Sequence, residues 1–84
     1  MKYHLKIIPK AEKDLDGLGA YDFNSVKKKI LLLNENPRPF GCQKLAADEG
    51  YRIRAGDFRI LYRIDDHAKE VIIYRVKHRR EVYR

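Results

Sequence analysis

The sequence predicts one α+β domain, in which a two-helix hairpin packs against an antiparallel sheet of about four strands. Three observations predict this class: an alternating segment opens the chain, two segments of helical periodicity follow, and three further alternating segments complete it. The 84 residues suffice for a single domain spanning residues 1–84, because domains rarely fall below roughly 50 residues. With 44% hydrophobic and 37% charged residues, the composition is that of a packed core with a charged surface, unlike that of a disordered tail.

The chain is expected to open with a strand that leads directly into a helix. Residues 3–8, YHLKII, alternate as a strand does, and Pro9 suits the first position of a helix. Apolar residues then recur at helical spacing: Ala11, Leu15 and Leu18. Gly17 and Gly19 weaken and then end this helix, so it is short.

A second helix is expected to complete a helical hairpin. One apolar stripe defines it: Phe23, Val26, Ile30 and Leu33. Asp22 or Asn24 is the predicted N-cap, and the helix should end before Asn36-Pro37, because the residue before a proline avoids helical geometry. Residues 37–49 contain two prolines and a glycine, which predicts an ordered loop between helix and sheet.

Three strands are predicted near residues 50–55, 58–65 and 70–77. Gly56-Asp57 reads as a two-residue turn between the first two, since glycine adopts the positive φ that such turns need. This turn sets Arg54 directly opposite Arg59 across the hairpin.

The predicted strands have one apolar and one basic face, because side chains alternate along a strand. The apolar face of the hairpin comprises Tyr51, Ile53, Phe58, Ile60, Tyr62 and Ile64. Its basic face comprises Arg52, Arg54, Arg59 and Arg63. The last strand should extend the apolar face through three pairs: Ile72 with Ile64, Tyr74 with Tyr62, and Val76 with Ile60. Arg75 and Lys77 then join the basic face.

The charge distribution predicts an anionic partner. The net charge is +7, and eight of the nine arginines follow Gly50, whereas eight of the ten lysines precede it. Like charges opposed across strands cost about 0.2 to 1 kcal/mol per pair, which a fold alone does not require. The alternative is an exposed face that merely needs polar residues, with arginine stems covering Leu61 and Ile73.

Other residue types narrow the class of protein. Cys42 is the single cysteine, which excludes an intrachain disulfide and a thiolate metal cluster. No pair of histidines or carboxylates has metal-ligand spacing, so neither a metal nor another cofactor is expected. The longest aliphatic run, Ile30 to Leu33, is far shorter than a membrane helix requires, and a cytoplasmic protein is expected.

Several segments together resemble the RelE/ParE superfamily of toxin–antitoxin toxins over nearly the whole chain. They are the opening strand and helix, NENP at 34–37, KL at 44–45, YRIRAGDFRILYRI at 51–64 and VKHRREVY at 76–83. The resemblance implies a fold like that of microbial ribonucleases, with two helices on a curved antiparallel sheet. RelE-like members cleave mRNA in the ribosomal A site without a metal, whereas ParE-like members inhibit DNA gyrase.

The resemblance to RelE-like members also implies a set of catalytic residues. By position these are Arg52, Arg54, Arg59, Arg79 and Tyr83, and Arg80 can exchange with Arg79. Arg59 and Arg79 are expected to clamp the scissile phosphate, while Arg52 and Arg54 hold the backbone and support the leaving group. The best-known members carry lysines at the positions of Arg52 and Arg54. Arginine is effectively never deprotonated, so neither can be a general base.

The general base remains open between three side chains in the C-terminal segment. Tyr83 is expected to stack on a base or share the 2′-hydroxyl proton, with packing of the C-terminus as the alternative. His78 has a suitable intrinsic pKa but no evident acidic partner, and Glu81 is a further candidate. Additional RNA contacts are expected from Arg63, Arg75, Lys77, His78 and Arg80.

The expected partners are a cognate acidic antitoxin, forming a hetero-oligomer with the toxin, together with the ribosome and mRNA. Two alternatives stay open, namely a ParE-like gyrase inhibitor that does no chemistry and a catalytically weak member that only binds antitoxin or RNA.

Overall fold

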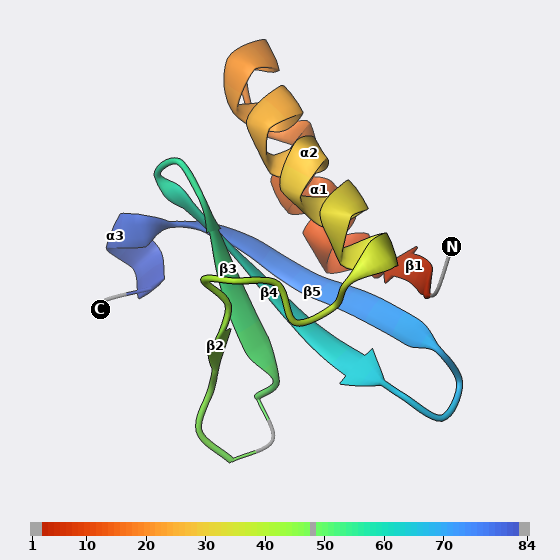
Figure 1. The fold of residues 1–84 in the computed structure, drawn as a ribbon. Coiled ribbons are helices and arrows are strands. Elements are labelled where there is room, and N and C mark those ends of the chain that lie inside the picture. Colours follow the sequence, from red (N-terminus) through yellow and green to blue (C-terminus); the bar gives the residue numbers. More distant parts are fainter. Residues whose placement is uncertain (1–2, 48, 83–84) are drawn as a thin grey trace.

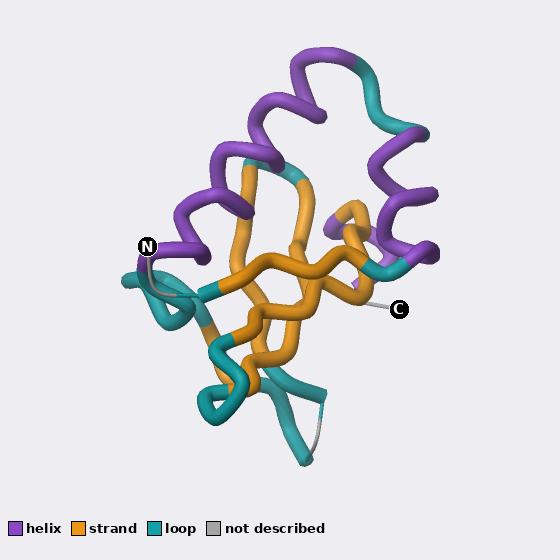
Figure 2. Tube along the Cα trace, turned by 90° about the vertical axis from the view of Figure 1, so that its right-hand side faces the viewer, coloured by secondary structure: helices purple, strands orange, loops and turns teal. Residues whose placement is uncertain are grey.

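The protein folds as two layers, with helices α1 and α2 on one face of a five-stranded sheet (Figures 1 and 2). The computed structural model describes residues 3–47 and 49–82. In chain order the elements are β1 (His4–Ile7), α1 (Pro9–Asp16), α2 (Ala20–Glu35), β2 (Gln43–Lys44), β3 (Tyr51–Ala55), β4 (Phe58–Asp65), β5 (Glu70–His78) and α3 (Arg79–Val82). The predicted α+β class and its helical hairpin are confirmed. No helix in the described ranges is long and apolar enough to cross a membrane.

The sheet is mixed and has one strand more than predicted. Its spatial order is β1-β5-β4-β3-β2. β1 joins as an edge strand and runs parallel to β5, although the two strands are separated in the chain by both helices and three strands. The additional strand, β2, is only two residues long and pairs antiparallel with β3.

The second helix ends as predicted but begins earlier, and the first ends at Asp16 with Gly17 as its C-cap, so that the predicted stripe residue Leu18 lies outside it. α1 starts at Pro9, and α2 stops at Glu35, just before Asn36. The predicted caps Asp22 and Asn24 are wrong, because α2 already begins at Ala20. Gly19 is the N-cap in an extended conformation, and no side chain caps this end.

The core, to which α1 contributes the buried Ala11, lies between the two helices and the sheet. Its fully buried large side chains are Tyr62, Leu33, Ile60, Ile73, Val26 and Val71. Ile30 joins them from the predicted stripe of α2, whereas Phe23 at the start of that stripe stays 36% exposed.

The pairing of the last strand differs from the prediction because of a β-bulge. Tyr62 pairs with Ile73 and Ile64 with Val71, whereas the prediction paired them with Tyr74 and Ile72. The register shifts between Leu61 and Tyr62, so β5 holds one extra residue there. As a result Ile73 and Val71 are buried in the core, and Tyr74 and Ile72 are only partly buried.

Candidate nucleic-acid interface

Three cations lie in a line across the sheet face that points away from the helices. The β3–β4 turn contains Gly56 at φ +61°, and it sets Arg54 opposite Arg59 as predicted. Arg59 in turn pairs with Lys77 of β5. We call Arg54, Arg59 and Lys77 the cation row. Each neighbouring pair opposes like charges, an arrangement that by itself disfavours the folded state.

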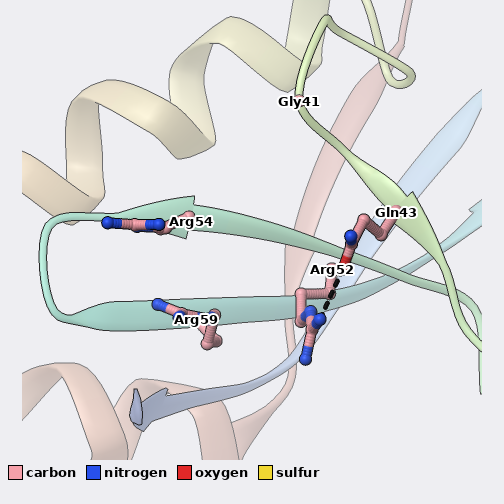
Figure 3. A pocket seen from close by; sticks show the side chains of 5 residues that line it. All are labelled: Gly41, Gln43, Arg52, Arg54 and Arg59. Carbon is pink, nitrogen blue, oxygen red and sulfur yellow. Dashed lines mark hydrogen bonds between the residues drawn. The ribbon is translucent and has the colours of Figure 1, made fainter.

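The hairpin arginines line a cleft of about 190 Å³, which we call the arginine cleft (Figure 3). Arg54 is exposed, whereas Arg59 is only 6% exposed. Arg52 donates a hydrogen bond to the side-chain oxygen of Gln43, which holds its guanidinium at the cleft wall. Partial burial of guanidinium groups reduces screening by water, so an anion in this cleft is attracted more strongly than on an open surface.

Two residues of this cleft, Gly41 and Gln43, were not predicted from the sequence as site residues. Both come from the segment that leads from α2 into β2, and they approach the arginines only because β2 pairs with β3. Gly41 has a positive φ of +94°, which glycine adopts readily. A single glycine in the sequence does not indicate which residues it will contact.

A set of long-range contacts holds the segment that carries Gly41. The Tyr62 hydroxyl donates a buried hydrogen bond of 2.7 Å to the carbonyl of Pro37. Arg38 forms a two-bond ion pair with Asp66, at 2.8 and 3.2 Å, and its Nε donates to the Tyr51 hydroxyl. Bonds from Arg38, and from a tyrosine hydroxyl near the N-terminus, lower the pKa of Asp66 to about 2. Asp66 is therefore ionised at neutral pH, as this ion pair requires.

Helix α3 lies beside the β3–β4 turn (Figure 1). The Arg79 backbone N–H donates to the Asp57 carbonyl at 2.7 Å, and its Nε lies 3.8 Å from the Asp57 carboxylate. Arg80 is exposed in the same short helix. Tyr83, the predicted catalytic tyrosine, lies outside the described residues. The structure thus brings Arg79 to the turn that connects Arg54 and Arg59.

His78 is engaged in local structure. Its ring packs edge-on against Phe58 with 5.3 Å between the ring centres, and its Nδ1 accepts the backbone N–H of Arg80. The backbone N–H of His78 donates a hydrogen bond of 2.9 Å to the Glu81 carboxylate. These contacts give His78 a role in holding β5 and the start of α3 in place.

Arg75 does not join the basic face, and that prediction was wrong. Its Nε donates to the Asp14 carboxylate of α1 at 2.8 Å, and the Val76 N–H donates to the same carboxylate at 2.9 Å. Burial alone would raise the pKa of Asp14, but the bonds from Arg75 and Val76 outweigh it and hold the pKa below its usual value.

Arg63 lies on the basic face but away from the arginine cleft. Its guanidinium stacks over the ring of Tyr74, with 4.7 Å to the ring centre. It lines a separate hollow together with Lys44 and Arg38. In the described ranges, no group of three or more His, Cys, Asp or Glu side chains is arranged to hold a metal ion.

Comparison with known proteins identifies the family. The sequence model of the family described as the ParE toxin of the type II toxin–antitoxin system parDE matches residues 5–83. RelE1 of Methanocaldococcus jannaschii is 32% identical over 88 residues, an alignment that covers this whole chain and 98% of RelE1. The chain belongs to the RelE/ParE family of type II toxins. The resemblance stated from the sequence is therefore confirmed.

Solved structures of RelE proteins share the fold of this RelE/ParE-family toxin. One is the archaeal RelE–RelB complex from Pyrococcus horikoshii, with a TM-score of 0.82 and 28% identity, covering 94% of this chain and 97% of that one. Another is the RelBE2 toxin–antitoxin complex of Mycobacterium tuberculosis, with a TM-score of 0.81 and 28% identity, covering 93% and 99%. The isolated RelE toxin of E. coli gives a TM-score of 0.79 at 29% identity, covering 96% and 90%.

Proposed function

We propose that this RelE-family toxin is a ribosome-dependent mRNA endoribonuclease that inhibits translation. The observation that carries the proposal is the arginine cleft, where three guanidinium groups from one hairpin line a hollow and two of them, Arg54 and Arg59, belong to the cation row. Guanidinium groups bind phosphate oxygens through paired hydrogen bonds, so the cleft suits a phosphodiester.

The proposed reaction uses the RNA's own 2′-hydroxyl as the nucleophile. Its oxygen forms a bond to the adjacent phosphorus while the bond to the 5′-oxygen breaks, which leaves a 2′,3′-cyclic phosphate and a 5′-hydroxyl. One proton leaves the 2′-hydroxyl and one reaches the departing 5′-oxygen, so no water or metal is consumed. The protein must hold the attack in line and stabilise the additional negative charge on phosphorus.

Arginines suit the charge-stabilising part of this reaction. We assign Arg59 and Arg79 to the nonbridging phosphate oxygens, and Arg52 and Arg54 to the RNA backbone and the leaving oxygen. The half-buried setting of the cleft strengthens these interactions. Proton removal falls to a residue other than an arginine, for which Tyr83 and Glu81 stay the candidates.

An acidic antitoxin is the proposed partner that silences the toxin. The M. tuberculosis and P. horikoshii neighbours are toxin–antitoxin complexes. On this chain, the outer side of α2 exposes Tyr21 and Leu32 and lines a hollow with Lys28 and Lys29. An apolar stripe flanked by lysines suits an acidic amphipathic segment that folds as it binds, and the basic sheet face is a second candidate surface.

A ParE-like gyrase inhibitor is the second candidate function. The matching family model describes a ParE toxin, and arginines stand at positions 52 and 54, where the best-known ribonucleases of the family have lysines. The protein would then act by binding and would need no proton transfer.

Incubation with mRNA-programmed ribosomes tests the choice. If the toxin is a ribonuclease, the mRNA should be cut in phase with its codons. The upstream fragments should end in a cyclic phosphate, and the downstream fragments should begin with a 5′-hydroxyl. Uncut mRNA together with loss of gyrase supercoiling activity would support the alternative instead.

Single substitutions test the phosphate clamp in cells. Arg59→Ala and Arg79→Ala should each abolish growth inhibition while antitoxin binding stays measurable, because each removes a phosphate ligand. Lys13→Ala, which removes an exposed cation of α1, is the matched control and should remain toxic. Toxicity that survives both arginine substitutions would rule out the clamp.

A further inference from the structure

A second hollow of about 270 Å³ lies on the outer face of the sheet, next to the arginine cleft. It lies between the segment before β3 and the short helix α3, and it crosses β3, β4 and β5. Arg52 lines both hollows, so the two adjoin. Small-molecule sites usually measure roughly 300 to 1,000 Å³, so this one suits a ligand the size of a single nucleobase.

The walls of this hollow combine apolar surface with an aromatic ring. Leu45 and Leu61 contribute aliphatic surface, and Tyr74 contributes its ring. Arg63 stacks over that ring at 4.7 Å, which fixes its orientation. Burial raises the pKa of the Tyr74 hydroxyl, so the ring is uncharged at neutral pH. Proteins recognise single-stranded RNA by stacking its bases on such rings.

The polar residues of the hollow include two carboxylates among cations. Glu49 and Glu81 line it together with Arg52 and Lys77. The Glu81 carboxylate is held by the N–H of His78 at 2.9 Å, which gives it a defined position. An ionised carboxylate only accepts hydrogen bonds, and on a phosphate-binding face it repels phosphate. Its presence there is therefore explained better by a ligand that donates hydrogen bonds.

We infer that this hollow is a recognition pocket for one RNA base that carries an exocyclic amino group. The amino group donates to a carboxylate while the base lies against Tyr74 and Leu61. Uracil has a carbonyl oxygen at position 4, where cytosine has its amino group, and a carboxylate repels that oxygen, so uracil is disfavoured. The inference rests on the proposed RNA cleavage, since the arginine cleft would hold the phosphate next to the recognised base.

Cytosine and uracil give a matched test, because they are equal in size and differ at position 4 in an amino group against a carbonyl. The probes are CpC and UpU, each with a 2′-O-methyl group on its first nucleotide so that it cannot be cleaved, titrated into the ¹⁵N-labelled protein. CpC should bind about five- to tenfold more tightly than UpU, the lower part of the range for one carboxylate–base contact. The amide signals of Leu61, Tyr74 and Lys77 should shift.

Charge-neutral substitutions then identify the acceptor. Glu81→Gln or Glu49→Gln should bring the ratio of the two affinities close to one, since an amide can serve either base. The Glu81→Gln variant keeps an oxygen for the N–H of His78, and amide spectra report whether each variant stays folded. Glu12→Gln, at an exposed glutamate of α1, makes the same change in net charge and should leave the ratio unaltered.

The outcomes separate the pocket from the ribonuclease proposal. Equal binding of CpC and UpU by the wild-type protein overturns the pocket, and so does a preference that survives in both folded variants. A CpC preference without any mRNA cleavage on ribosomes supports the pocket and overturns the proposed reaction. Cleavage that occurs without any base preference at the cut supports the proposed reaction and overturns the pocket.

Discussion

Replacement of Arg54 by glutamine should stabilise the fold while it weakens function. Arg54 lies at one end of the cation row and faces Arg59, which faces Lys77. An opposed pair of like charges costs about 0.2 to 1 kcal/mol. Arg59 is only 6% exposed, so water screens this pair poorly and the upper half of that range applies. We expect the free energy of unfolding to rise by about 0.5 to 1 kcal/mol at low ionic strength.

Urea denaturation measures this change, since urea leaves the ionic strength unaltered. With a slope of about 1 kcal/mol per molar urea for a small domain, the midpoint should rise by about 0.5 to 1 M. The gain should nearly vanish in 1 M salt, where the screening length falls to about 3 Å. Lys13→Gln lowers the net charge equally but lies outside the row, and it should change stability by less.

Two results would refute the reasoning behind this prediction. One is an Arg54→Gln protein that is no more stable than Lys13→Gln. The other is a gain that salt does not reduce. Either would mean that the aligned cations do not repel one another appreciably and that this face does not require an anion. A short RNA should conversely stabilise the wild-type protein more than the variant, because a ligand stabilises the state that it binds.

Two further substitutions test how the site is supported. Asp14→Asn should lower the free energy of unfolding by about 1 to 2 kcal/mol at neutral pH, whereas Asp16→Asn in the same helix should not. The folded-state pKa of Asp14 is depressed, so its contribution is complete above the ordinary value of 3.8, and the difference from wild type should shrink as pH falls through the folded-state pKa in urea titrations. Gly50→Ala should cost about 1 to 3 kcal/mol more than Gly41→Ala. Both glycines have φ above +90°, but only at Gly50 would the added Cβ meet the backbone carbonyl of Tyr62, and similar losses for the two would contradict the structure.

The parts of the site that were predictable from sequence are those fixed by local geometry. The Gly56-Asp57 turn sets the register of the hairpin, so the pairing of Arg54 with Arg59 followed from two residues. The same reasoning separated the basic face from the apolar one.

The parts that were not predictable depend on contacts distant in sequence. The segment VIIYRV at 71–76 is apolar or amphipathic at nearly every position, so its pattern could not reveal a bulge. The partner of Arg75 is 61 residues away in α1. Gly41 and Gln43 reach the arginine cleft only through the pairing of a two-residue strand, which no periodicity predicts.

The placement of carboxylates supports the view that the outer face is built for a nucleotide. At the periphery of the sheet, Asp14 and Asp66 neutralise Arg75 and Arg38 through two-bond ion pairs. If charge balance were the only requirement, a carboxylate within the cation row would be the simplest addition, because opposite charges across strands stabilise a sheet. The row instead consists of three cations, and carboxylates enter this face in the adjoining hollow. The proposed nucleotide ligand would match this division, since its phosphate is an anion and the edge of an amino-bearing base donates hydrogen bonds.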